Sequence, residues 1–117
     1  MANAVGRGTT PTFTWRLRNI LYTDIAVLWL TIKQGDVMLD LDLNSTGLTL
    51  EDETEVIEQQ TVHNTLVHVL LSQEETLMFR SDKKAEAQIR VRFGDDTAGK
   101  TKVYDLDVER ILKDGVI

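Results

Sequence analysis

The residues best placed to do chemistry lie in one stretch, residues 94–101, which reads GDDTAGKT. This stretch matches the G-x-x-x-x-G-K-[ST] pattern of a phosphate-binding loop at every required position. In such a loop, backbone N–H groups surround the phosphates, and a helix begins at the Lys-Thr pair so that its positive end faces the anion. A functional match would make the protein a nucleotide-binding enzyme.

The surrounding sequence argues against a phosphate-binding loop. Asp95 and Asp96 would place two carboxylates beside a triphosphate. Sixteen residues follow Thr101, whereas one further strand–helix–strand unit needs about 30. Aspartate, glycine and threonine are common turn residues. The sequence therefore predicts a hairpin turn here and no binding of ATP or GTP.

A second set of polar residues has the spacing of a calcium-binding loop. Asp40, Asp42, Asn44 and Glu51 occupy its positions 1, 3, 5 and 12. Ser45 stands where that loop requires glycine, and the flanking residues alternate as in strands rather than helices. We expect these carboxylates to form a solvated strand face, without a metal.

The histidines do not suggest a metal or catalytic site. The two histidines, His63 and His68, are five residues apart, and this odd spacing places strand side chains on opposite faces. The chain has no cysteine, which removes disulfides, thiolate zinc sites and cysteine nucleophiles. We therefore expect no catalytic residues, no metal and no cofactor.

Length, composition and charge describe one folded domain. The chain has 117 residues, of which 42% are hydrophobic and 27% charged, as in globular proteins. The net charge of −6 argues against a nucleic-acid or anionic-membrane partner. The longest apolar run, residues 25–30, is far shorter than the roughly 20 residues of a membrane helix. The first residues lack the apolar run of a signal peptide, so we expect a cytoplasmic origin.

Alternation of apolar and polar residues predicts an all-β fold. The clearest hairpin joins residues 25–33 to residues 37–43. Residues 72–75, Ser-Gln-Glu-Glu, form a capping box that predicts one helical turn ending near Phe79. We expect residues 1–11 to be a flexible N-terminal arm and residues 12–117 to form a single antiparallel immunoglobulin-like (Ig-like) β-sandwich of about seven strands. The predicted strands cover residues 13–17, 25–33, 37–43, 66–71, 85–93 and 102–108, with short pieces at 48–50 and 56–57 around an acidic loop.

Two of these strands are apolar on both faces, which predicts an interface. If Leu28 and Leu30 face the core, Val27 and Trp29 face outward. Val67 and Val69 add a second apolar face to another strand. A large outward aromatic either lies under another segment, such as the N-terminal arm, or marks a contact surface. We expect these four residues to contribute to a subunit interface.

Three segments of the chain, in their order, resemble small proteins encoded in bacterial prophage structural cassettes. They are the opening RGTTPTFT at residues 7–14, LLSQEETLMF at residues 70–79, where the family has a strand meeting a TQEET turn, and AQIRVR at residues 87–92. The resemblance implies a compact Ig-like β-sandwich from a neck, tail or baseplate gene neighbourhood, with no enzyme activity. The middle of this chain, residues 51–64, is longer than in that group.

The resemblance implies a non-enzymatic virion structural or assembly protein that acts through protein–protein contacts. Its partners would be other virion proteins or copies of itself, and we expect a homo-oligomer. It would reside in the host cytoplasm during assembly and then in the virion. No catalytic or binding residue carries over, because the family offers none to match. The alternative is a small cytoplasmic adaptor or peptide-binding β-domain.

Overall fold

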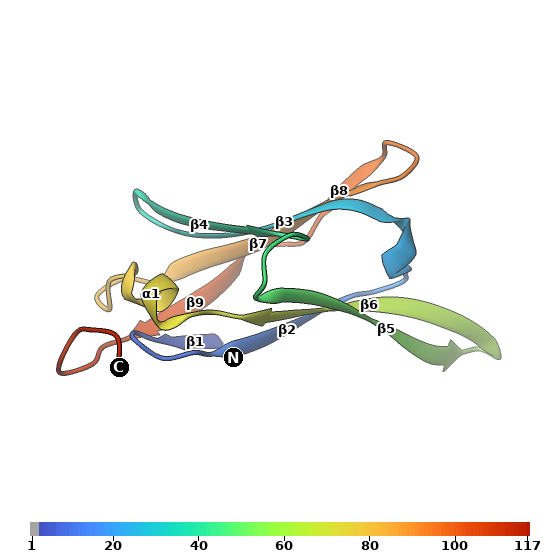
Figure 1. Ribbon diagram of the computed structural model, residues 1–117. Helices are drawn as coiled ribbons and strands as arrows, with labels where there is room; N and C mark the ends of the chain where they lie inside the picture. Colours follow the sequence, from blue (N-terminus) through green and yellow to red (C-terminus); the bar gives the residue numbers. More distant parts are fainter. Residues whose placement is uncertain (1–2) are drawn as a thin grey trace.

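In the described part of the chain, nine strands form two sheets that enclose a shared core (Figure 1). The computed structural model describes residues 3–117. The larger sheet has the order β1-β9-β7-β3-β4, with β8 also paired to β7, and the smaller sheet has the order β2-β6-β5. The strands are β1 (Asn3–Gly6), β2 (Thr12–Leu17), β3 (Ile25–Gln34), β4 (Val37–Asp42), β5 (Leu48–Ile57), β6 (Gln60–Leu70), β7 (Ala85–Phe93), β8 (Ala98–Lys100) and β9 (Tyr104–Glu109).

The predicted all-β class is confirmed, but the description as a purely antiparallel sheet structure of about seven strands is wrong. β1 runs parallel to β9, with Val5 opposite Val108, so the larger sheet is mixed. The extra strands arise from β1 and from β8, a three-residue strand whose glycine-containing sequence has no apolar face. β8 and β9 pair with different halves of the same edge of β7.

Residues 3–11, expected to belong to a flexible arm, include strand β1 and are bonded to the rest of the fold. Val5 is fully buried. The Arg7 guanidinium donates to the Phe79 carbonyl at 2.7 Å and forms an ion pair with Asp114 at 2.6 Å. The buried Thr76 hydroxyl donates to the Thr9 carbonyl at 3.0 Å. Residues 1 and 2, which belonged to the same prediction, lie outside the described residues.

The β3–β4 hairpin agrees with its prediction. Leu28, Leu30 and Ile32 are buried on the inner face of β3. A bulge between Ile25 and Val27 changes the register at the start of the strand. Ala26 is therefore exposed, although strict alternation would place it on the same face as the buried Leu28. In the core, the Trp15 ring of β2 packs against two other aromatic rings. The ring centroids are 5.7 Å apart for Trp15 and Phe13 and 6.3 Å apart for Trp15 and Tyr104.

β5 and β6 form one long hairpin rather than short strands around an acidic loop. β5 pairs with β6 along its whole length, and residues 51–55 lie within that pairing. β2 pairs with β6 only from Leu70 to Thr65, so the rest of the hairpin projects as a two-stranded ribbon (Figure 1). Glu58 and Gln59 at its tip have φ of 50° and 67°, as a type I′ turn requires.

Two short helices of the described residues lie in connections between the two sheets, one between β2 and β3 and the other between β6 and β7. The capping box predicted at Ser72 is confirmed, with Ser72 and Glu75 each accepting from the other's backbone N–H, and α1 covers Gln73–Leu77. A 3-10 turn, η1 (Tyr22–Asp24), leads into β3. Among the helices of residues 3–117, none has the length and apolar character needed to cross a bilayer.

The inward and outward faces of β4 can be tested by adjacent truncations. Leu41→Ala should lower the free energy of unfolding by about 2–5 kcal/mol, because Leu41 is buried in the core. Asp40→Ala should change it by less than about 0.5 kcal/mol, because Asp40 is exposed and accepts one surface hydrogen bond from Thr31. Urea unfolding measures both. A loss from Asp40→Ala that exceeds the loss from Leu41→Ala would mean that the faces are assigned backwards.

Candidate interaction surface

Trp29 lies on the outer face of the larger sheet. Its neighbours Leu28 and Leu30 point into the core and are fully buried, so alternation along β3 turns Trp29 outward. Trp29 is 52% exposed. On the two adjacent strands, Asp42 of β4 and Arg90 of β7 are its directly opposite partners. The Arg90 guanidinium carbon lies 5.6 Å from the centroid of the indole ring, a cation–π contact.

In the rows of Trp29 and Thr31, the charges are sorted by sign across the strands; farther along the same face, Lys33 of β3 and Glu86 of β7 lie opposite each other. β4 presents Asp40 and Asp42 on one side. β7 and β8 present Arg90 and Lys100, which lie opposite each other on the other side. Among residues 3–117, no carboxylate forms an ion pair with Arg90 or Lys100. We call this surface the Trp29 face and define it by Val27, Trp29, Thr31, Met38, Asp40, Asp42, Arg90 and Lys100, whose side chains share the outer face of β4, β3, β7 and β8.

Of the four predicted interface residues, two lie on this face and two do not. Val27 is partly buried beside Trp29. Val67 and Val69 are 0% and 1% exposed and belong to the core, which corrects the prediction that they form an open apolar face. They face inward because they pair with Trp15 and Phe13 of β2, which are also buried. The outward residues of β6 there are Leu66, His68 and Leu70.

The N-terminal segment does not cover Trp29 in the described structure. β1 pairs with β9 at one edge of the larger sheet, whereas β4 forms the opposite edge. Besides the partly buried Val27, the Trp29 face carries the apolar side chain of Met38, which is 51% exposed. Sequence reasoning missed Met38, although its position in β4, out of phase with Leu39 and Leu41, signals an outward side chain.

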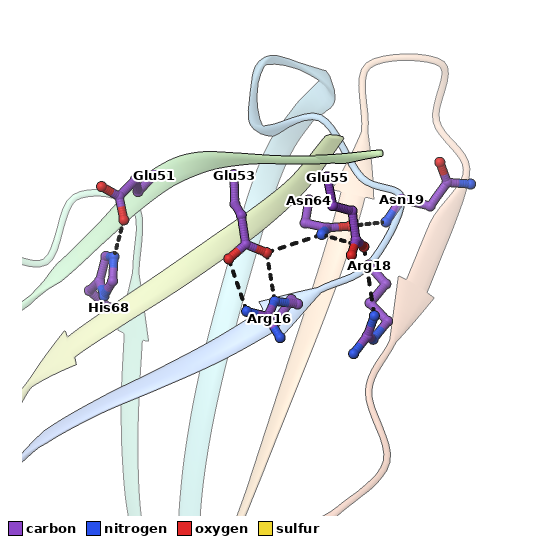
Figure 2. A network of polar contacts seen from close by, with 8 residues as sticks. All are labelled: Arg16, Arg18, Asn19, Glu51, Glu53, Glu55, Asn64 and His68. Atoms are coloured by element: carbon purple, nitrogen blue, oxygen red, sulfur yellow. Dashed lines mark hydrogen bonds and ion pairs between the residues drawn. The ribbon is translucent and has the colours of Figure 1, made fainter. Parts of the chain in front are cut away.

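The outer face of the smaller sheet carries a network of polar contacts that joins three strands (Figure 2). Arg16 of β2 donates two hydrogen bonds to Glu53 of β5, at 2.6 and 2.9 Å. The fully buried Asn64 of β6 donates to Glu53 at 3.1 Å and to Glu55 at 2.9 Å, and its oxygen accepts from the Asn19 N–H at 2.9 Å. The network lies where the hairpin leaves β2, so it fastens the projecting ribbon to the sheet.

The electrostatics of this network favour a structural role. Hydrogen bonds from Arg16 and then from Asn64 hold the pKa of Glu53 below its ordinary value of 4.5. The same contact raises the pKa of Arg16. Both groups therefore stay charged at neutral pH. A carboxylate with a lowered pKa is a poor general acid.

The two histidines occupy opposite faces of β6, as their odd spacing predicts. The ring of His68 contacts the Thr14 hydroxyl through Nδ1 and the Glu51 carboxylate through Nε2, both at 3.0 Å. His63 contacts Asp52 at 3.1 Å on the other face. Each histidine thus has a carboxylate from the neighbouring strand β5 as its partner, and the two rings do not converge on one site.

Residues 94–97 form the turn between β7 and β8, and residues 98–100 are β8 itself, so the predicted hairpin turn is confirmed. The Asp95 carboxylate accepts from the Thr97 hydroxyl at 2.6 Å and from its N–H at 3.0 Å, and these bonds lower the pKa of Asp95. A strand, not a helix, contains Lys100. The Thr101 hydroxyl, which a phosphate loop would use for magnesium, accepts from the Ile89 N–H at 3.1 Å and donates to the Lys102 carbonyl at 2.8 Å.

The remaining candidates do not assemble into a site. A pocket beside the β7–β8 turn has Asp24 and Asp95 as its charged lining residues, which suits no phosphate. Of the calcium-pattern residues, Asp40 and Asp42 lie on the Trp29 face, whereas Glu51 lies on the other sheet against His68. In the described part of the chain, no three histidine, aspartate or glutamate side chains are grouped to hold a metal ion.

Asn64→Asp tests the structural role of the network. The change replaces two amide N–H donors with a carboxylate within hydrogen-bond distance of Glu53 and Glu55, so we expect a loss of more than about 2 kcal/mol in the free energy of unfolding. The matched control is Asn44→Asp, an exposed site in the loop after β4, which should be nearly neutral. Equal losses at pH 7 would show that the network does not fasten the hairpin.

We also predict that the protein does not bind nucleotides. Titration calorimetry with magnesium-ATP should detect no binding tighter than about 1 mM, a free energy of roughly −4 kcal/mol. The reasons are the two aspartates of the loop and the engaged Thr101 hydroxyl. Tighter binding that Lys100→Ala abolishes would contradict this account.

The Trp29 face is therefore a surface on which a half-exposed aromatic lies between acidic and basic side chains that form no ion pairs within residues 3–117. No family model matches the chain, and neither does any curated protein or solved structure.

Proposed function

We propose that the protein is a non-enzymatic phage or prophage structural or assembly protein that acts through protein–protein contacts. The observation that carries this proposal is Trp29, half exposed between an acidic and a basic strand on the outer face of a sheet. Tryptophan and arginine are the residues most enriched at the energetic centres of protein interfaces. Trp29 and Arg90 lie in contact on this face.

The rest of the molecule supports a role based on contacts rather than chemistry. In residues 3–117, every buried side-chain nitrogen or oxygen atom has a hydrogen-bond partner, so no orphaned group points to an absent ligand. The histidines and the lowered-pKa carboxylates Glu53 and Asp95 make local cross-strand or turn contacts at the surface. These groups stabilise the hairpins that carry them.

The assignment to a virion comes from the resemblance of residues 7–14, 70–79 and 87–92 to prophage structural-cassette proteins. In this proposal the two sheets correspond to the Ig-like sandwich of that group. The protein would assemble in the host cytoplasm, in the neck, tail or baseplate region, and would then remain in the virion. Other virion proteins or copies of the same chain would be its partners.

An edge of the larger sheet favours a second candidate function. β4 ends the strand order of that sheet, so one side of its backbone is free to accept an added strand. A peptide-binding adaptor in the cytoplasm would use such an edge. In that case the recognised ligand would be an extended segment of another protein, and its side chains would meet Met38 and Asp40 on the Trp29 face.

The open reading frames that flank this gene test the virion assignment. We expect portal, terminase or tape-measure genes nearby, because structural genes of a phage are encoded together. A neighbourhood with none of these genes would overturn the virion proposal and favour the adaptor.

A further inference from the structure

We propose that the Trp29 face binds a second copy of this chain, in a two-fold dimer whose axis runs parallel to β3. This inference rests on the proposed function, since it names the partner of that surface. In the dimer, Trp29 would lie against its own symmetry mate. The acidic side of each face would lie over the basic side of the other.

The charge pattern favours a second copy of this chain as the partner that covers the Trp29 face. Asp42, Trp29, Arg90 and Lys100 form one row across four neighbouring strands, because each is the directly opposite partner of the next. One half of this row is negative and the other half positive, with the apolar residue between them. Such a surface is complementary to itself after a two-fold rotation, which is the property of an isologous interface.

The same pattern fixes the direction of the symmetry axis. When two faces pack together, their two-fold axis lies in the plane between them. An axis perpendicular to the strands would set β4 against β4 and bring Asp42 toward its own copy, which like-charge repulsion disfavours. An axis parallel to the strands sets β4 over β7 and β8 of the other copy, so that Asp42 lies near Arg90 and Lys100.

The size of the face predicts a weak dimer. With strands about 4.8 Å apart and residues about 3.3 Å apart, four strands and seven residues of β3 cover on the order of 400 Å². This is about half the area that each partner buries in a standard interface. We therefore expect a dimer that dissociates on dilution and in high salt.

Complementary charge reversal tests both the partner and the axis. The acid-reversed variant is Asp40→Arg with Asp42→Asn, because asparagine keeps the side-chain oxygen that accepts from the Asn44 N–H at 2.8 Å. The base-reversed variant is Arg90→Asp with Lys100→Asp. Sedimentation velocity over a concentration series should show a dimer for the natural chain and a monomer for each variant alone. An equimolar mixture of the two variants should form a heterodimer.

The controls separate loss of contact from loss of fold. Glu74→Arg in α1 and Lys113→Asp near the C-terminus reverse exposed charges away from the Trp29 face and should leave the dimer unchanged. Circular dichroism should show the same spectrum for all variants. A natural chain that is monomeric up to about 1 mM, where binding would be weaker than roughly −4 kcal/mol, would overturn the dimer, as would a mixture that stays monomeric. Neither result bears on the flanking genes, which test the proposed function separately.

Discussion

The alternation of side chains along β3 is the constraint on which the rest of the structure depends. Leu28 and Leu30 are fully buried between the sheets, and burial of each such side chain contributes about 1.5–3 kcal/mol. Turning Trp29 inward would turn both leucines out, so the core holds the indole on the outer face. Nothing in the core requires a tryptophan at that position, since a polar residue would satisfy the alternation. In our proposal, contact with a second copy of the chain accounts for the tryptophan.

The polar residues on the outer faces of the two sheets have different roles. On the smaller sheet, charges of opposite sign are paired across strands, as Arg16 is with Glu53, and Asn64 ties the acids of β5 to the core. A two-stranded ribbon alone is only marginally stable in water, so these contacts serve the fold. Around Trp29 on the larger sheet, Asp40 and Asp42 lie on β4, whereas Arg90 and Lys100 lie on β7 and β8. Segregated charge contributes little to a monomer, but it can orient a partner.

Local features were predictable from the sequence and non-local ones were not. Three predictions that depend on neighbouring residues are confirmed: the β3–β4 hairpin, the capping box at Ser72 and the turn after β7. β1 was missed because its buried residue Val5 is held by a parallel partner about a hundred residues away, Val108. The sequence predicted two short strands in place of β5, because residues 51–55 have no apolar face. These residues find their partners on other strands. The same limit affected the predicted interface: β6 is apolar on both faces, so only pairing with β2 shows that Val67 and Val69 point inward.

The fluorescence of Trp29 alone tests most directly whether this side chain enters a contact. Trp15→Phe removes the other, buried indole, and circular dichroism would verify that this protein keeps its fold. The account predicts that, as protein concentration rises, Trp29 emission shifts to shorter wavelength and acrylamide quenches it less. Emission and quenching typical of a solvent-exposed indole, constant across a concentration series reaching about 1 mM, would contradict the account.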